Sequence, residues 1–349
     1  MKLTKDNLEA LCLGASVLGS GGGGNPVYKK LIVAQQLERF GPITIVSADD
    51  LRDDDLVVPF STMGAPLVAL ERILSGKEFP ALYAAVTSAF GKAPAALMAA
   101  EIGGSNALTP FMVAGELGLP VLDADLMGRA FPELQMSSAE LKKIPATPAF
   151  LADAMGNTVI FNTNDAFTLE RMARAVTVAA GSTAAVAIYL LTGKLIKAGA
   201  AVGNTVSRAL DIGTTILAAR AQGADVVRTV AAHCGGTLVG FGSITDINHT
   251  VAAGFLRGTV TIDNAFEVEY QNEYLVLKHN GVIQATTPDM IVLLEQETGT
   301  PIGSESLTYG LRVGILVLSA PLVWQSPEGL ALIGPRVFGY DYDYVRKQS

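Results

Sequence analysis

The chain has few of the residues that build disulfide frameworks and metal sites. Only 2 cysteines and 3 histidines occur among its 349 residues. Cys12 and Cys234 form neither a disulfide framework nor a metal-binding knuckle, which is typical of a protein of the reducing cytoplasm. We expect Cys234 to be structural, because only His233 stands beside it to stabilise a thiolate. His249 and His279 have no partner at metal-ligand spacing, so a histidine-based zinc site is not expected.

Charged residues are also scarce, and acidic ones outnumber basic ones. They make up 17% of the chain, and the formal net charge is −8. The sequence has no basic run, whereas nucleic-acid binding needs clustered Lys and Arg to meet the phosphates. We therefore expect a small-molecule substrate rather than a nucleic-acid partner. The low charge and the 36 glycines favour close packing and a homo-oligomer.

No segment is predicted to enter a membrane. The first residues, Met1 to Asp6, lack the apolar core of a signal peptide. Residues 175–193 carry no charge and approach the length of a membrane span. Small and hydroxyl residues such as Gly181 and Ser182 dilute this stretch, so we expect a buried helix at a domain or subunit interface.

Alternating strand and helix patterns predict an α/β fold for the first half. Apolar residues at helical spacing after Thr4 predict an opening helix, and a second helix is expected from Asn25 and Pro26 to about Phe40. Further helices are expected from Pro66 and at 107–117, and short buried strands at 43–46, 56–60, 95–100 and 121–122. Such alternation gives a mainly parallel sheet covered by helices.

The second half has a different pattern. A hairpin is expected at 150–163, followed by three apolar helices between Thr168 and Gly223 and a short helix that ends at Gly235. Strands at 238–241, 259–262, 266–270 and 274–278 then predict a small barrel or sandwich. We place the domain boundary near residue 165, which gives an α/β domain at 1–165 and a helical segment plus a β-rich, barrel-like domain at 166–349.

A run of glycines separates the first two predicted helices. Gly21, Gly22, Gly23 and Gly24 precede Asn25 at a helix N-terminus, where free N–H groups favour anions. The spacing is not that of a dinucleotide-binding fingerprint, and the run lacks the lysine of a phosphate-binding P-loop. We expect this run to bind a ligand through its backbone. The alternative is a tight corner between two helices.

Three further loops follow predicted strands, at 61–66, 101–106 and 123–129. Ligands of open parallel sheets bind beyond the carboxyl ends of the strands, so we expect these loops and the glycine run to form one pocket. The polar side chains that they would bring to its rim are Thr62, Glu101, Asn106, Asp123, Asp125 and Arg129.

These residue types suit acid–base chemistry. Asp123, Asp125 and Glu101 would crowd three carboxylates beside Arg129, and crowding raises the pKa of one carboxyl, as a general acid or base requires. The two aspartates are separated by one residue, so an extended segment would point both to the same side. We expect no bound metal; the alternative is a divalent cation held by the oxygens of these carboxylates.

Each side chain also has a structural interpretation. Asn106 would then cap the helix that follows it, and Arg129 would pair with Asp123 or Glu133. These interpretations stay open at the level of the sequence.

Several motifs resemble one bacterial family. The glycine run at 18–26, the Glu-Ile-Gly-Gly-x-Asn motif at 101–106 and the Asp-Ala-Asp-x-Met-Gly-Arg-Ala-Phe-Pro-Glu motif at 123–133 carry the resemblance in the first half. Residues 254–260 and 334–341 carry it in the second half. The chain resembles the S-methyl thiohydantoin desulfurase family along nearly its whole length.

The resemblance implies an α/β N-terminal domain and a β-rich C-terminal domain. It also implies hydrolysis at C2 of a small hydantoin-like ring, which releases a thiol and leaves hydantoin. A carboxylate pair would serve as base and acid, and Arg129 or the glycine-run amides would hold a ring oxygen or a carboxylate tail. Two other functions stay open: a binding or regulatory protein for a small anionic metabolite, and a subunit of a hydantoinase-like complex.

Overall fold

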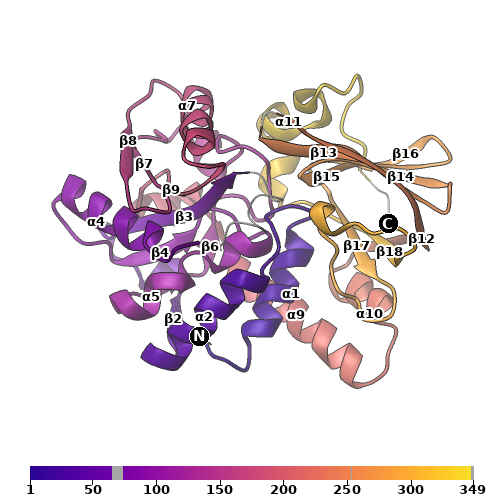
Figure 1. Cartoon of the computed structure of the whole chain (residues 1–349), viewed down its shortest axis with the longest axis horizontal. Helices are drawn as coiled ribbons and strands as arrows, with labels where there is room; N and C mark the ends of the chain where they lie inside the picture. Colours follow the sequence, from indigo (N-terminus) through magenta and orange to yellow (C-terminus); the bar gives the residue numbers. More distant parts are fainter. Residues whose placement is uncertain (65–73, 253, 347–349) are drawn as a thin grey trace.

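The computed structural model describes residues 1–64, 74–252 and 254–346. Its two halves lie side by side. The first half forms a sheet covered by helices, and the second half forms an antiparallel sheet (Figure 1). The helix predicted to begin at Pro66 lies outside the described residues.

The first half is built on a mixed sheet of nine strands. The order is β1-β2-β5-β4-β3-β9-β7-β8, with β10 paired to β3. Strands β2, β5, β4 and β3 run parallel to one another, and the other pairs are antiparallel. The predicted parallel core is confirmed. The strands are β1 Lys2–Leu3, β2 Ile43–Val46, β3 Leu56–Gly64, β4 Ala96–Ala99, β5 Val121–Leu122, β7 Ala149–Ala152, β8 Thr158–Phe161, β9 Thr183–Ala187 and β10 Leu191–Thr192.

Both faces of this sheet are buried. Along β3, Val58 and Phe60 join one hydrophobic cluster and Val57 joins a second, because neighbouring residues of a strand point to opposite faces. Helix α4 packs against β7 and β9, α5 packs against α2, and α7 packs against β3 and β9. The elements that cover the sheet are α1 Leu8–Leu18, α2 Val27–Phe40, α4 Glu78–Phe90, α5 Phe111–Leu117, α6 Ser138–Leu141 and α7 Ala166–Ala179, with the 3-10 turns η1 Ala48–Asp50 and η2 Gly104–Leu108.

The uncharged stretch at 175–193 is not the buried helix that the sequence predicts. Helix α7 ends at Ala179, and β9 follows with all five of its residues buried between β3 and β7. Its three alanines favour helix, but a central strand covered on both faces accepts small apolar residues. Across the described residues, no helix is long and apolar enough to cross a membrane.

The prediction of three apolar helices between Thr168 and Gly223 is wrong, because β9 and β10 lie between α7 and α9 Thr205–Ala221. The short elements between β10 and α9 are α8 Gly193–Leu195, η3 Ile196–Ala200 and β11 Val202–Gly203, which pairs with β6 Ala124–Asp125. The short helix predicted to end at Gly235 is α10 Val226–His233. Helices α1 and α9 pack closely: a Cβ on Gly14 would lie 1.7 Å from the backbone oxygen of Ala209. Glycine therefore sets the separation of these helices.

The second half is an antiparallel sheet of seven strands that curls into a half-barrel. Its order is β16-β15-β14-β13-β12-β18-β17. Val260, Val268, Leu277 and Leu293 point into its core, as alternation along each strand requires. The predicted β-rich, barrel-like domain is confirmed. The strands are β12 Thr237–Ala252, β13 Phe255–Ile262, β14 Phe266–Gln271, β15 Glu273–His279, β16 Val282–Thr286, β17 Met290–Glu295 and β18 Arg312–Leu318, and they are accompanied by η4 Ser304–Ser306, η5 Leu322–Gln325, α11 Pro327–Ile333 and η6 Pro335–Phe338.

The glycine run joins the two halves. The backbone oxygen of Ser20 accepts a hydrogen bond from the amide of Tyr274 at 2.7 Å, and that of Gly21 accepts one from the amide of Ser304 at 2.8 Å. Ser20 Oγ donates to the backbone oxygen of Ile291 at 2.9 Å. The run is thus fixed against β15 and β17. The domain boundary near residue 165 stays a prediction, and β9, beyond it, belongs to the first sheet.

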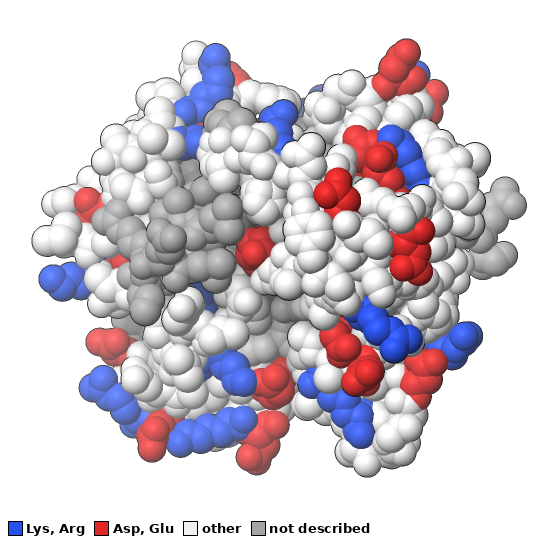
Figure 2. Space-filling model, turned by 45° about the vertical axis from the view of Figure 1, so that its right-hand side comes forward, with Lys and Arg blue, Asp and Glu red and all other residues white. Residues whose placement is uncertain are grey.

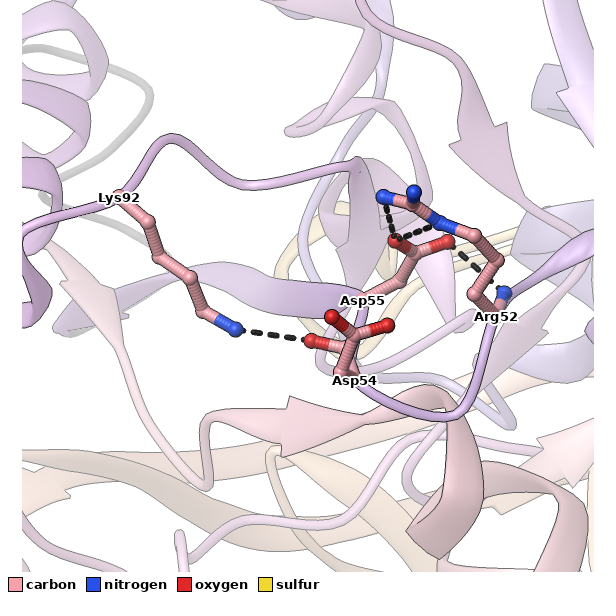
Figure 3. Close-up of polar contacts among 4 residues, drawn as sticks. All are labelled: Arg52, Asp54, Asp55 and Lys92. Carbon is pink, nitrogen blue, oxygen red and sulfur yellow. Dashed lines mark hydrogen bonds and ion pairs between the residues drawn. The ribbon is translucent and has the colours of Figure 1, made fainter.

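Charged side chains form hydrogen bonds near the amino end of β3, away from the glycine run. Arg52 Nη2 donates to Asp55 Oδ1 at 2.8 Å, and Lys92 Nζ donates to the backbone oxygen of Asp54 at 2.8 Å (Figure 3). On the face shown in Figure 2, acidic and basic side chains are interspersed over both halves. Exposed ion pairs of this kind contribute little to stability.

Candidate active site

A pocket lies where the glycine run, the carboxyl end of β3 and the loop after β4 meet. It has a cavity volume of about 100 Å³. Residues 61–64, the loop at 101–106 and the glycine run all contribute to its lining, and the segment at 123–129 contributes Met127. The second half contributes as well. The polar or backbone groups that matter below come from Gly23, Gly24, Thr62, Glu101, Asn106 and Glu273.

Glu101 is the buried carboxyl of the first half that lines this pocket. It follows β4 and is 6% exposed. Asn106 Nδ2 donates to its Oε1 at 2.6 Å, and the amide of Phe131 donates to its Oε2 at 3.2 Å. Burial raises the pKa of Glu101 to about 7, although both hydrogen bonds act in the opposite direction. A carboxyl that titrates near neutrality inside a pocket is suited to general base catalysis.

Asn106 is held in one orientation by a buried lysine. Its Oδ1 accepts hydrogen bonds from Lys29 Nζ at 3.0 Å, from Thr62 Oγ1 at 2.6 Å and from the amide of Thr62 at 3.1 Å. The Asn106 amide group must therefore present its Nδ2 to Glu101. Burial lowers the pKa of Lys29 to about 7, while the charge of Glu101 acts in the opposite direction. The interpretation of Asn106 as a helix cap is wrong, because its side chain belongs to this network.

Glu273 comes from the second half and reaches the pocket at the start of β15. It is 2% exposed, and its Oε2 has no hydrogen-bond partner among the described residues. A Cβ on Gly22 would lie 1.9 Å from its Oε1. Burial raises the pKa of this carboxyl well above its ordinary value; the charge of Glu101 adds to this, and the charge of Arg129 opposes it. Position 22 must be glycine because the carboxyl occupies the space of a side chain.

The other glycines of the run differ in their surroundings. Gly23 and Gly24 line the pocket, and a Cβ on Gly23 would lie 2.2 Å from the backbone oxygen of Gly103. A Cβ on Gly21 would lie 2.6 Å from the ring of Tyr274. Asn25 Oδ1 accepts the amide of Val27 at 3.0 Å at the start of α2. The run therefore serves both the packing of the two halves and the wall of the pocket.

Comparison with known proteins decides the family. Residues 6–163 match the model of the S-Me-THD-like N-terminal domain, and residues 163–346 match that of the S-Me-THD-like C-terminal domain. The chain belongs to the S-Me-THD-like family. A crystal structure of a protein from Chromobacterium violaceum is similar in fold, with a TM-score of 0.81, 24% identity and 99% of each chain covered. The chain has no match among curated proteins.

In this S-Me-THD-like protein, Asp123 and Asp125 stand outside the pocket lining. Asp123 Oδ1 accepts the amide of Ser207 at 2.9 Å, and Ser207 Oγ also donates to Asp123 at the start of α9. Asp125 accepts the amides of Ile102 at 2.9 Å and Gly128 at 2.9 Å. The two carboxyls therefore bind different elements instead of facing one cleft together. Their predicted roles as base and acid stay predictions.

Arg129 also stands outside the pocket lining and connects the two halves. It is fully buried, and its Nη1 donates to the backbone oxygens of Pro288 at 2.5 Å and Asp289 at 3.0 Å. Its guanidinium lies 4.7 Å from the centre of the Phe131 ring. The structure thus replaces the expected pairing with Asp123 or Glu133 by contacts to the second half.

The described residues of this protein form no cluster of metal-binding side chains. No group of three or more His, Cys, Asp or Glu residues among them is placed to hold a metal ion. The carboxyls of Asp123 and Asp125 accept backbone amides, and a cation bound by these two aspartates and Glu101 stays an alternative.

His233 and Cys234 lie at the end of α10, and neither lines the pocket. His233 Nε2 is 2.6 Å from Asp211 Oδ2. Burial raises the pKa of the Cys234 thiol, which disfavours a nucleophilic thiolate.

Sequence reasoning missed Lys29 and Glu273. Lys29 belongs to a helix whose other charged residues face solvent, and a lysine in such a helix normally does the same. Glu273 follows a turn at Asn272 and begins a strand, where alternation of polar and apolar residues predicts an exposed side chain. Only the approach of β15 to the glycine run brings Glu273 to the pocket. No local signal in the sequence marks that approach.

Proposed function

We propose that this protein is a hydrolase of a small hydantoin-like ring, of the S-methyl thiohydantoin type. The observation that supports this most directly is Glu101, a buried carboxyl with a pKa raised to about 7 that lines a cavity of about 100 Å³. A small concave pocket with a few converging polar groups is typical of a site for a small molecule.

The reaction replaces sulfur by oxygen at C2 of the ring. C2 carries the S-methyl group and a double bond to a ring nitrogen, so it is an amidine-like electrophile. Water adds to C2 while the Glu101 carboxylate accepts one of its protons, and the C2–S bond then breaks. The products are hydantoin and methanethiol. Asn106 holds the Glu101 carboxylate in place, and pre-positioned groups of this kind lower the barrier without reorganisation.

The glycine run supports substrate binding. Gly23 and Gly24 expose backbone at the pocket wall, with positive φ angles of 75° and 76° that residues with a side chain rarely adopt. Thr62 also lines the pocket, and because its hydroxyl proton is donated to Asn106 Oδ1, its oxygen is left to accept a ring N–H. These groups recognise a polar ring by hydrogen bonds.

A non-catalytic binding protein for a small anionic metabolite is the second candidate. Arg174 lines the pocket, but it is paired with Glu170, and the guanidinium lies 4.2 Å from the centre of the Phe255 ring. Glu101, a buried carboxyl on the same lining, repels an anion when it is ionised. We therefore favour turnover of a neutral ring.

The test is release of methanethiol from S-methyl thiohydantoins by the purified protein. A free-thiol reagent reports the rate, and hydantoin identifies the second product. We expect turnover by the wild type and none by Glu101→Gln. Tight binding of the ring without any thiol release would show that the binding function is correct and that the hydrolase proposal is wrong.

A further inference from the structure

Two buried carboxyls from different halves of the chain share the pocket. Glu101 follows β4, and Glu273 begins β15, 172 positions later in the sequence (273 − 101). The charge of Glu101 is among the causes that raise the pKa of Glu273. Two carboxyls that repel one another in a low-dielectric site do not both ionise near neutrality, so one keeps its proton.

The hydrogen bonds decide which carboxyl is charged. Glu101 accepts two donors, Asn106 Nδ2 and the amide of Phe131, and Lys29 stands behind Asn106. The Glu273 carboxyl accepts a hydrogen bond from the backbone of Gly23, but its Oε2 accepts no donor among the described residues. Donors stabilise a carboxylate, and a buried carboxylate oxygen without one is costly. The negative charge therefore resides on Glu101 and the proton on Glu273.

We propose that Glu273 is the catalytic acid of this site and works with Glu101 as base across the junction of the two halves. The inference rests on the proposed hydrolysis. The other carboxyl of the lining, Glu133, is partly buried and accepts a hydrogen bond from Gln135. Asp125 is fully buried and already accepts several backbone amides. Glu273 is the lining carboxyl with a buried, unpartnered oxygen.

Glu101 and Glu273 can carry all the proton transfers of the reaction. As water forms its bond to C2, one water proton moves to the Glu101 carboxylate, and Glu273 gives its proton to the ring nitrogen, which takes up the electron pair of the C2–N double bond. In the second step the new hydroxyl returns a proton to Glu273 as C2=O forms. The C2–S bond breaks, and the departing sulfur takes the proton from Glu101. Both carboxyls then have their starting states.

The glycine run makes this arrangement possible. Glu273 Oε1 occupies the space where a Cβ of Gly22 would lie, at 1.9 Å from that position. The backbone of Gly23 donates a hydrogen bond that acts to lower the pKa of Glu273, whereas burial, the largest cause, raises it. The charged groups that face Glu273 are Glu101 and Arg129. Arg129 Nη1 donates to backbone oxygens of the second half. Its charge acts to lower the pKa of Glu273, but burial and the charge of Glu101 are the larger causes and keep that pKa raised.

The first measurement is a turnover profile against pH with a confirmed substrate. Wild-type kcat/KM should rise as Glu101 ionises near pH 7 and fall at higher pH as Glu273 loses its proton. Glu273→Gln should lower kcat at least about a hundredfold and abolish the fall at high pH. Because Gln is close in shape to a protonated carboxyl, the Glu273→Gln variant should fold. Glu273→Asp keeps a carboxyl on a side chain one methylene shorter, and it should retain an intermediate rate.

The matched control is Glu305→Gln. Glu305 is a half-buried carboxyl of the second half whose Oε2 is buried and has no partner among the described residues, but it lines a different, smaller cavity beside the glycine run. This variant should keep near-normal turnover. If Glu273→Gln folds and keeps its kcat and the high-pH limb, or if Glu133→Gln abolishes that limb instead, Glu273 is not the acid. Equal losses in Glu305→Gln and Glu273→Gln would also overturn the inference.

The second measurement needs no substrate. Carbon-13 NMR of carboxyl-labelled glutamate follows the protonation of Glu273, whose signal is assigned by its absence from Glu273→Gln. We expect Glu273 to be protonated at pH 7 in the wild type and to ionise at lower pH in Glu101→Gln. Ionisation at pH 7 in the wild type would overturn the inference. If no ring releases thiol, the proposed function and the catalytic role both fail, whereas the NMR titration alone decides the shared proton.

Discussion

Replacing Glu101 by Gln should lower activity and change how stability depends on pH. The pKa of Glu101 is raised from 4.5 to about 7, mainly by burial. A shift of this size contributes about 3 kcal/mol to the free energy of unfolding while the carboxyl is protonated, and this contribution is lost when it ionises. Because the folded pKa is the higher one, this contribution is complete below pH 4.5 and is lost as the pH rises to about 7.

The variant also disturbs one hydrogen bond. Asn106 Nδ2 now donates to Glu101, and Asn106 cannot turn over because Lys29 and Thr62 hold its oxygen. The Gln side chain can accept from Phe131 or from Asn106, but its amide nitrogen then faces a donor. This costs about 1–3 kcal/mol. Glu101→Gln should therefore be less stable than the wild type at pH 5, and equally or more stable at pH 8.

Denaturant unfolding at a series of pH values measures this crossover, and the thiol-release assay measures turnover. We expect at least about a hundredfold loss of kcat in Glu101→Gln at every pH, the usual scale for the loss of a general base. A stability difference that is the same at pH 5 and pH 8 would show that Glu101 does not titrate in this range. Near-normal turnover would show that the carboxyl is not the base.

Three further variants test neighbouring parts of the site. Asp125→Asn should destabilise the fold by about 2–4 kcal/mol, since its oxygens accept several backbone amides and an Asn offers one acceptor; chemical unfolding measures this, and full stability with lost turnover would favour direct catalysis. Gly23→Ala should raise KM or prevent folding, because φ is 75° and a Cβ would lie 2.2 Å from the Gly103 oxygen; unchanged kinetics would separate Gly23 from the pocket. Cys234→Ala should keep full turnover, and inactivation of the wild type by one equivalent of a thiol reagent, prevented by substrate, would contradict this.

The fold could be predicted from the sequence wherever local composition and burial agree. Strand β2 occupies the predicted residues 43–46, and β4 lies within the predicted 95–100. The failure at β9 has a physical cause: its alanines have high helix propensity, but the strand is buried on both faces between β3 and β7, and packing decides its structure.

The site could be predicted in part. The sequence indicates the loops that meet at the pocket, because glycine runs and loops after parallel strands are local features. It does not indicate which carboxyls face inward. Asp123 and Asp125 stand in the most distinctive motif of the chain, yet their carboxyls bind Ser207 and backbone amides. Residues of a distinctive motif can be required for the fold as well as for chemistry. In this motif Arg129 binds backbone oxygens of the second half and so helps to hold the two halves together.

The glycine run explains why the site requires both halves of the chain. Its backbone oxygens at Ser20 and Gly21 accept hydrogen bonds from the amides of Tyr274 in β15 and Ser304 in η4, so the run is fixed to the second half. Gly23 and Gly24 of the same run form a wall of the pocket that contains Glu101. A shift of the second half would therefore move a pocket wall and the carboxyl of Glu273 together. Catalysis by an acid from one half and a base from the other then requires the junction to be rigid, and Arg129, buried between the halves, supplies a fixed contact there.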